Sequence, residues 1–334
     1  MTVHRSPSWD MPLRTRVFVK ALARERPAIR TLGPDDLTRV RAWVAPARPP
    51  YTWVTGPVHR DVAIESSGFA ARDGHHVPVR IYRPRRAAAS PRPALMWFHG
   101  GGWVLGSPRG YDPICSAIAH DTGVVVVSVD YRLAPEHRAP KAALDCVDAT
   151  RWVAREAVSL GVRPTGIGVA GDSAGGNLAA VVSQVLRDEG GAEISYQCLV
   201  YPGVDATMSS PSVTEHAEAP VLTHSDMVAF LEHYLGEGPD ALDPLHPLVS
   251  PLYAAELGGL PPALVQTADL DPLRDEGAMY ARALRAAGVE VVHTNYLRAP
   301  HGFLSFPGAT PAGRAARRDL THWVRARTWP GTVD

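Results

Sequence analysis

The chain has 334 residues, 45% of them hydrophobic, and its 34 Lys and Arg residues balance 34 Asp and Glu residues. This length and composition suit one large domain with insertions, or two smaller domains, with enough apolar residues for a substantial core. The balanced charge argues against a nucleic-acid-binding protein, and three scattered cysteines argue against a disulfide framework.

Residues 1–58 are predicted to form helices that precede the sheet. Apolar residues separated by basic ones indicate an amphipathic helix over 11–26, and a second helix is expected over 35–44, before a Pro-rich loop at 46–50. The apolar stretch at 17–19 ends at Lys20, which is unlike a secretory signal, and no apolar run approaches the ~20 residues that cross a bilayer. We therefore expect a cytoplasmic protein with no integral membrane segment.

From residue 59 to 334, strands and helices alternate in the pattern of an α/β fold. Strands are predicted at 61–65, 77–82, 94–98, 124–129, 166–170, 194–201, 263–268 and 289–296, and helices at 108–122, 140–160, 178–187, 272–287 and 311–327. The first two strands flank a turn at Asp73 and Gly74 and form an expected antiparallel pair. The rest predicts a mostly parallel eight-stranded sheet with helices on both faces. Residues 203–258 interrupt this alternation with a long Pro-rich insertion, which has one helical segment at 225–235. An insertion of this length indicates a functional loop or a cap.

Residues 171–177, GDSAGGN, contain the pattern G-x-S-x-G between a predicted strand and a predicted helix. In this context the glycines allow a sharp turn that lifts the hydroxyl of Ser173 above the sheet, at a helix N-terminus that favours developing negative charge. Outside such a context the pattern is common, and Ser173 would then be a helix N-cap in a glycine-rich turn. The strand and helix on either side favour an activated serine nucleophile.

A serine nucleophile needs a base and an orienting acid, which in this fold follow later strands in the order Ser, acid, His. Among fourteen histidines, His301 lies in a loop after the strand predicted at 289–296, whereas His293 and His322 fall inside a strand and a helix. Asp271 and Asp269 both follow the strand at 263–268. Asp271 also precedes Pro272, as a helix N-cap would, and spacing alone leaves both residues as candidate acids.

Residues 99–103, HGGGW, directly follow the strand predicted at 94–98. Successive glycines let backbone N–H groups turn toward a neighbouring site, and the N–H groups of Gly101, Gly102 and Ala174 are the expected oxyanion hole. The alternatives are a flexible loop or a phosphate-binding nest, but no G-x-x-x-x-G-K-[ST] pattern accompanies it. We expect His99 to anchor this loop by hydrogen bonds. The sequence predicts no cofactor and no metal site.

Four blocks together resemble the hormone-sensitive-lipase-like carboxylesterases of the α/β-hydrolase superfamily, in the branch with G-D-S-A-G. They are HGGGW at 99–103, YRLAPEH at 131–137, GDSAGGN at 171–177, and DPLRDEG at 271–277 followed by HGF at 301–303. The resemblance implies an α/β-hydrolase fold with Ser173 as nucleophile, His301 as base and Asp271, rather than Asp269, as acid. It implies an oxyanion hole at Gly101, Gly102 and Ala174, and a helical cap made from residues 1–58 and 203–258. It also implies a possible homodimer, with the strand at 289–296 as a candidate edge.

We therefore interpret the chain as a serine carboxylesterase that hydrolyses short- to medium-chain esters through an acyl-enzyme. Its expected partner is a small-molecule ester. An amidase, formamidase or acyltransferase with the same triad is the first alternative, because HGGGW also resembles formamidases. A non-enzymatic ligand receptor on the same scaffold is the second, although such proteins typically lack the histidine that is present here.

Overall fold

The centre of the molecule is an eight-stranded sheet in the order β1-β2-β4-β3-β5-β6-β7-β8. β1 pairs with β2 and β2 with β4 in antiparallel fashion, and all other neighbours are parallel. The computed structural model describes residues 10–25, 28–86, 91–239 and 241–329. The strands are β1 (Val62–Ala70), β2 (His76–Pro84), β3 (Ala94–Phe98), β4 (Val125–Val129), β5 (Ile167–Asp172), β6 (Ile194–Val200), β7 (Ala263–Leu270) and β8 (Val291–Pro300).

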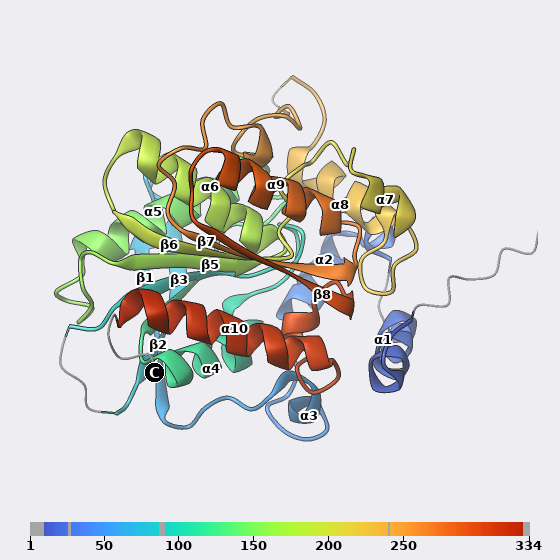
Figure 1. Cartoon of the computed structure of the whole chain (residues 1–334), viewed down its shortest axis with the longest axis horizontal. Coiled ribbons are helices and arrows are strands. Elements are labelled where there is room, and N and C mark those ends of the chain that lie inside the picture. Colours follow the sequence, from blue (N-terminus) through green and yellow to red (C-terminus); the bar gives the residue numbers. More distant parts are fainter. Residues whose placement is uncertain (1–9, 26–27, 87–90, 240, 330–334) are drawn as a thin grey trace, which may run out of the picture.

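Helices cover both faces of the sheet (Figure 1). One face carries α4 (Asp112–Thr122) and α10 (Pro311–Thr328), and the other carries α5 (Lys141–Arg155), α6 (Ala174–Glu189) and α9 (Arg274–Ala286). Every residue of β3, β4 and β5 is buried, as expected for apolar strands that are covered on both sides. The predicted α/β-hydrolase architecture, with eight strands and helices on both faces, is confirmed.

Several smaller helices gather at the end of the sheet to which the parallel strands point (Figure 1). They are α1 (Leu13–Glu25) and α2 (Pro34–Ala42) from the N-terminal region, and α7 (Pro211–Glu215) and α8 (His224–Leu235) from the insertion. The two regions meet where η1 (Ile29–Thr31) contacts α8. The remaining short helices are α3 (Tyr51–Thr55), η2 (Pro108–Tyr111), η3 (Pro251–Tyr253) and η4 (Phe303–Ser305). Across the described ranges, no helix combines the length and apolarity needed to span a membrane.

Some element boundaries differ from the sequence predictions for local reasons. The helix predicted at 178–187 begins at Ala174, because the small residues after Ser173 form its first turn. The helix predicted at 140–160 ends at Arg155 and continues as turns to Gly161, whose φ is +62°. The strand predicted at 289–296 lies at β8, 291–300. Neither α3 nor α7 was expected from the sequence, and both are only five residues long.

Candidate active site

Ser173 occupies the sharp turn between β5 and α6. Its φ of 56° and ψ of −122° are a strained conformation for a non-glycine residue. The flanking glycines are required by close packing, since a Cβ at Gly171 would lie 2.3 Å from the oxygen of Gly175, and one at Gly175 would lie 1.9 Å from the oxygen of Phe98. The Ser173 N–H donates to the carbonyl of Val200 over 2.9 Å, which ties the turn to β6.

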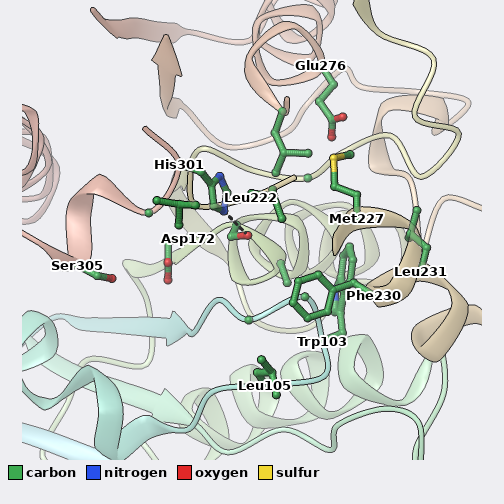
Figure 2. A pocket seen from close by; sticks show the side chains of 18 of the residues that line it. Trp103, Leu105, Asp172, Leu222, Met227, Phe230, Leu231, Glu276, His301 and Ser305 are labelled. Carbon is green, nitrogen blue, oxygen red and sulfur yellow. Dashed lines mark hydrogen bonds between the residues drawn. The ribbon is translucent and has the colours of Figure 1, made fainter. Parts of the chain in front are cut away.

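His301 and Asp271 approach Ser173 from the loops that follow β8 and β7. Nε2 of His301 lies 3.0 Å from Oγ of Ser173, and Nδ1 of His301 lies 2.7 Å from Oδ2 of Asp271. Both side chains are buried, and the ring of Tyr201 packs against His301 with 4.8 Å between centroids. The three residues predicted from sequence as nucleophile, base and acid therefore form one hydrogen-bonded chain, of which Figure 2 shows the bond from His301.

The other candidate acid, Asp269, faces a different part of the chain. Its carboxylate accepts hydrogen bonds from the N–H of Arg298 and from Nδ2 of Asn295, both on β8. The helix predicted to begin at Pro272 begins as α9 at Arg274, so the alternative interpretation of Asp271 as its N-cap does not hold. Instead, Oδ1 of Asp271 accepts the N–H of Leu273 over 2.9 Å and closes a turn before the helix. This bond fixes the carboxylate through Oδ1 and leaves Oδ2 to pair with Nδ1 of His301.

The glycine loop after β3 lies beside Ser173. The carbonyl of Gly101 accepts the N–H groups of Val104 and Leu105, and Gly101 has a φ of +126°, which only glycine adopts readily. A Cβ at Gly101 would lie 2.2 Å from the oxygen of Leu105. Within the described ranges, no hydrogen bond uses the N–H of Gly101, Gly102 or Ala174. All three residues line the same cavity as Ser173.

Asp172 connects this loop to the turn at Ser173, a role that the sequence analysis missed. Its Oδ1 accepts the N–H of Gly100 over 3.0 Å, and its Oδ2 accepts hydrogen bonds from the hydroxyls of Tyr111, at 3.0 Å, and Tyr201, at 3.4 Å. Burial raises the pKa of Asp172 to about 6, and the bond from Tyr111 offsets part of that rise. No local signal identifies the tyrosines, which lie 61 and 29 residues away along the chain.

His99 holds the start of the loop, in agreement with the sequence interpretation. Its Nδ1 lies 2.9 Å from the carbonyl of Gly100, and the hydroxyl of Tyr131 donates to the His99 carbonyl over 2.6 Å. Tyr131 also stacks on the imidazole with 4.3 Å between centroids. Burial lowers the pKa of His99 to about 4, so its imidazole is neutral near pH 7 and carries no charge into the site.

A cavity of about 320 Å³ opens above Ser173. Figure 2 shows its wall, in which Phe230, Met227 and Leu231 of α8 face Trp103 and Leu105 of the glycine loop. Further apolar members come from the N-terminal region and the insertion, and the polar side chains in the lining include those of Ser173, His301 and Glu276. The wall also includes Leu22, Val221, Leu222, Val249, Leu273 and Phe306.

Two further polar residues hold the insertion against the catalytic turn. Nδ2 of Asn177, in the first turns of α6, donates to the carbonyls of Gly203 and Val249, each over 2.7 Å. Oε1 of the buried Glu276 accepts the N–H groups of Val204 and Asp205. Burial raises the pKa of Glu276 well above its usual range. Both residues lie within the sequence blocks that carry the family resemblance, at 171–177 and 271–277. The sequence did not indicate which hydrogen bonds they form.

One group of metal-ligand side chains lies outside this site. His59, Asp61 and His120 have potential ligand atoms within 4.8 Å of one another, between the start of β1 and the end of α4. Nδ1 of His120 lies 2.6 Å from Oδ2 of Asp61, and the two imidazoles stack with 4.4 Å between centroids. These direct contacts account for the cluster, and we assign no ion to it.

Comparisons with known proteins agree with this geometry. A family model described as alpha/beta hydrolase fold matches residues 95–305. Carboxylesterase NlhH of Mycobacterium tuberculosis is 45% identical over 254 residues, which cover 75% of this chain and 78% of that protein. Ethyl acetate hydrolase of Pseudomonas putida is 38% identical over 240 residues, 71% of this chain and 74% of that protein. The solved structure of a hyperthermophilic esterase from the archaeon Pyrobaculum calidifontis has a TM-score of 0.84 at 38% identity and covers 95% of this chain and 98% of its own. The chain therefore belongs to the hormone-sensitive-lipase-like carboxylesterases of the α/β-hydrolase fold, and it hydrolyses carboxylic esters.

Proposed function

We propose that Ser173 is the nucleophile of this hydrolysis, His301 its general base and Asp271 the acid that orients His301. The chain of hydrogen bonds from Asp271 through His301 to Ser173 is the observation that carries the proposal. Asp271 keeps the proton on Nδ1 of His301, so that Nε2 is free to accept the proton of the serine hydroxyl. The strained turn holds that hydroxyl at the floor of the cavity.

The proposed reaction has two halves with the same proton path. Oγ of Ser173 attacks the ester carbonyl carbon while Nε2 of His301 takes its proton, and the N–H groups of Gly101, Gly102 and Ala174 stabilise the oxyanion. The protonated His301 then donates to the leaving alcohol oxygen as the acyl-enzyme forms. Water repeats the sequence on the acyl-enzyme, with its proton passing to His301 and then to Ser173 as the carboxylic acid leaves.

The substrates that fit best are esters of short- to medium-chain acids, held under the cap predicted at residues 1–58 and 203–258, of which residues 1–9, 26–27 and 240 lie outside the described ranges. A cavity of about 320 Å³ lies near the lower end of the range for small-molecule sites. Phe230 limits its width, because the ring reaches to 2.3 Å from the position that a Cβ on Gly102 would take. The relative named ethyl acetate hydrolase also points to a short acyl group.

Labelling with a fluorophosphonate, followed by peptide mass spectrometry, tests the nucleophile directly. We expect the wild-type chain to carry the label on Ser173, and Ser173→Ala to lose both the label and essentially all turnover of p-nitrophenyl butyrate. Label on another residue, or full activity in Ser173→Ala, would overturn the triad. Failure of the wild type to label would favour a ligand receptor instead.

A series of p-nitrophenyl esters from acetate to laurate tests the substrate class. We expect kcat/KM to peak at or below about eight carbons, and a peak at laurate would contradict the proposal. N-formyl and anilide analogues of the preferred ester belong in the same assay. If their kcat/KM exceeded that of the ester, the amidase or formamidase alternative would replace the esterase as the main activity.

A homodimer through β8 is a further part of the proposal. β8 is an edge strand of the sheet, and Leu297 on it is 74% exposed. An unpaired edge can extend its sheet into a second copy. Light scattering during size exclusion would report about twice the monomer mass, and Leu297→Asp would shift it toward the monomer. The cytoplasmic location stays a prediction.

A further inference from the structure

Helix α1 has two different apolar faces, and only one of them packs against the protein. The inner face consists of Thr15, Phe18, Val19 and Leu22, which follow the i, i+3, i+4, i+7 spacing of a packed helix. Val19 is fully buried, Thr15 Oγ1 donates to the carbonyl of Ala309, and Leu22 lines the catalytic cavity. This face alone accounts for the position of α1.

The outer face carries a second apolar row. Leu13 and Val17 are 67% and 61% exposed, and the exposed Ala21 follows at the same spacing of four residues. Residues spaced by four lie one above another along a helix, so the three form a stripe along the outside of α1. Core packing does not explain them, since no buried cluster of the described residues includes any of the three.

Four cations flank this stripe. Arg16, Lys20 and Arg24 form the adjacent row, again spaced by four residues, and Arg14 lies on the other side of it. All four are exposed, and none forms an ion pair with a residue that the structure describes. Glu25, the last residue of the helix, is its one acidic residue, and residues 1–9 contain no Asp or Glu.

We propose that the outer face of α1 docks the enzyme on an anionic lipid surface. The four cations would lie among the anionic headgroups, with their alkyl stems along the apolar boundary, while Leu13 and Val17 reach into it. A helix of 13 residues is about 20 Å long and presents roughly 200 Å² on one side, far less than the ~800 Å² that each partner buries in a stable protein interface. A strip of that size, whose four cations form no ion pair within the described ranges, suits a membrane better than a protein.

A segment that packs beside α1 also exposes an aromatic side chain. α3 and α1 both pack on the loop at 303–310, α1 through the Phe18–Phe306 ring contact and α3 through the Gly308 N–H bond to the carbonyl of Val54. Trp53 of α3 is 66% exposed, and Figure 1 shows α1 and α3 at the same corner of the molecule. Exposed Trp side chains are typical of surfaces that sit at the membrane–water boundary.

Docking through α1 would bring the catalytic cavity close to the lipid. The opposite face of the helix contributes Leu22 to the cavity wall, and Phe18 packs on Phe306, which also lines it. The cavity therefore lies about one helix diameter, ~10 Å, from the proposed docking surface. This arrangement favours ester substrates that partition into a membrane surface, in addition to those free in water.

Co-sedimentation with vesicles tests the proposal on the full chain. We expect binding to vesicles of phosphatidylglycerol and phosphatidylcholine in equal parts, and at least tenfold weaker binding to phosphatidylcholine alone or in 1 M salt. The variant Arg16→Gln/Lys20→Gln should bind about 25-fold more weakly, at about fivefold for each cation lost. Leu13→Ser/Val17→Ser should also weaken binding, which an effect of charge alone would not produce.

A matched control replaces two exposed arginines elsewhere. Arg282→Gln/Arg325→Gln, on α9 and at the far end of α10, changes the net charge equally and should bind within twofold of the wild type. All variants should hydrolyse p-nitrophenyl acetate at the wild-type rate, which shows that they fold and keeps this test separate from the triad. The proposal would be overturned if the wild type did not bind the vesicles, or if the control variant lost as much binding as Arg16→Gln/Lys20→Gln. It would also be overturned if the protein formed an oligomer that only Arg16→Gln/Lys20→Gln dissociates. The last result would assign the face to a second copy.

Discussion

The buried carboxyl of Asp172 should make the stability of the protein fall between acid and neutral pH, relative to a variant that lacks it. Asp172 is 3% exposed, and burial raises its pKa from 3.8 to about 6. Because folding raises this pKa, the native state binds the proton more tightly than the unfolded chain does. The stabilising contribution is therefore complete below about pH 4 and is lost as the pH rises through about 6. A rise in pKa of this size corresponds to about 3 kcal/mol.

Urea unfolding of the wild type and Asp172→Asn at pH 4, 5, 6, 7 and 8 measures this contribution. Comparing the two proteins at each pH removes the contributions that they share, so the difference between their free energies of unfolding reports mainly on residue 172. We expect the free energy of Asp172→Asn to rise relative to that of the wild type by most of this amount, about 2 kcal/mol, between pH 4 and 7, and to change little above that. A difference that stays constant over this range, or one that falls, would refute the reasoning.

Tyr111→Phe provides an internal check on the physical cause. The hydroxyl of Tyr111 donates to Oδ2 of Asp172 over 3.0 Å, and this bond lowers the pKa of the carboxyl. Without it the pKa of Asp172 should rise further, so the loss of stability should extend to higher pH than in the wild type. The double variant Tyr111→Phe/Asp172→Asn is the reference. If the pH range over which stability is lost moved to lower pH instead, a group other than Tyr111 would control the pKa of Asp172.

Three further changes test the proposed catalytic roles. Asp271→Asn should lower kcat for p-nitrophenyl butyrate by about 10⁴ without unfolding the chain, because His301 loses the partner that fixes its tautomer, and a loss below tenfold would contradict this role. Gly101→Ala should lower kcat by about 10² to 10³, since its Cβ would lie 2.2 Å from the oxygen of Leu105 and displace the loop; unchanged kcat would exclude the loop as oxyanion donor. Phe230→Ala should raise the ratio of kcat/KM for octanoate over butyrate by about tenfold, measured with the p-nitrophenyl esters, because it widens the cavity beside Gly102. An unaltered ratio would mean that Phe230 does not limit acyl length.

Local pattern was sufficient to predict the elements that form the sheet. The strand predicted at 94–98 coincides with β3, whose five apolar residues are all buried, and the turn at Gly74 has the φ of +81° that favours glycine. The carboxyl ends of the parallel strands then bring residues 173, 271 and 301 to one edge, because successive loops of such a sheet converge there.

The features of the site that the sequence did not predict depend on contacts between segments that are distant along the chain. The choice between Asp269 and Asp271 is set by β8, whose Arg298 N–H and Asn295 amide hold Asp269 away from His301. Likewise, Pro272 favoured a helix start at 272, but Asp271 closes a turn with the N–H of Leu273 while its other oxygen contacts His301. Helix propensity acts over one turn, whereas the contact with His301 joins residues 30 positions apart.

The turn at Ser173 combines two features that lower the stability of the fold and that interactions elsewhere must offset. Ser173 is strained at a φ of 56°, and Asp172 next to it is a carboxylate at the base of the glycine loop. Asparagine at 172 could still accept the N–H of Gly100, but its NH₂ group could not accept the hydroxyl protons of Tyr111 and Tyr201. We therefore expect Asp172→Asn to lose kcat, because the glycine loop is held less firmly. If kcat were unchanged, the ionised carboxylate would have no part in positioning the loop, and the cost of burying it would need another explanation.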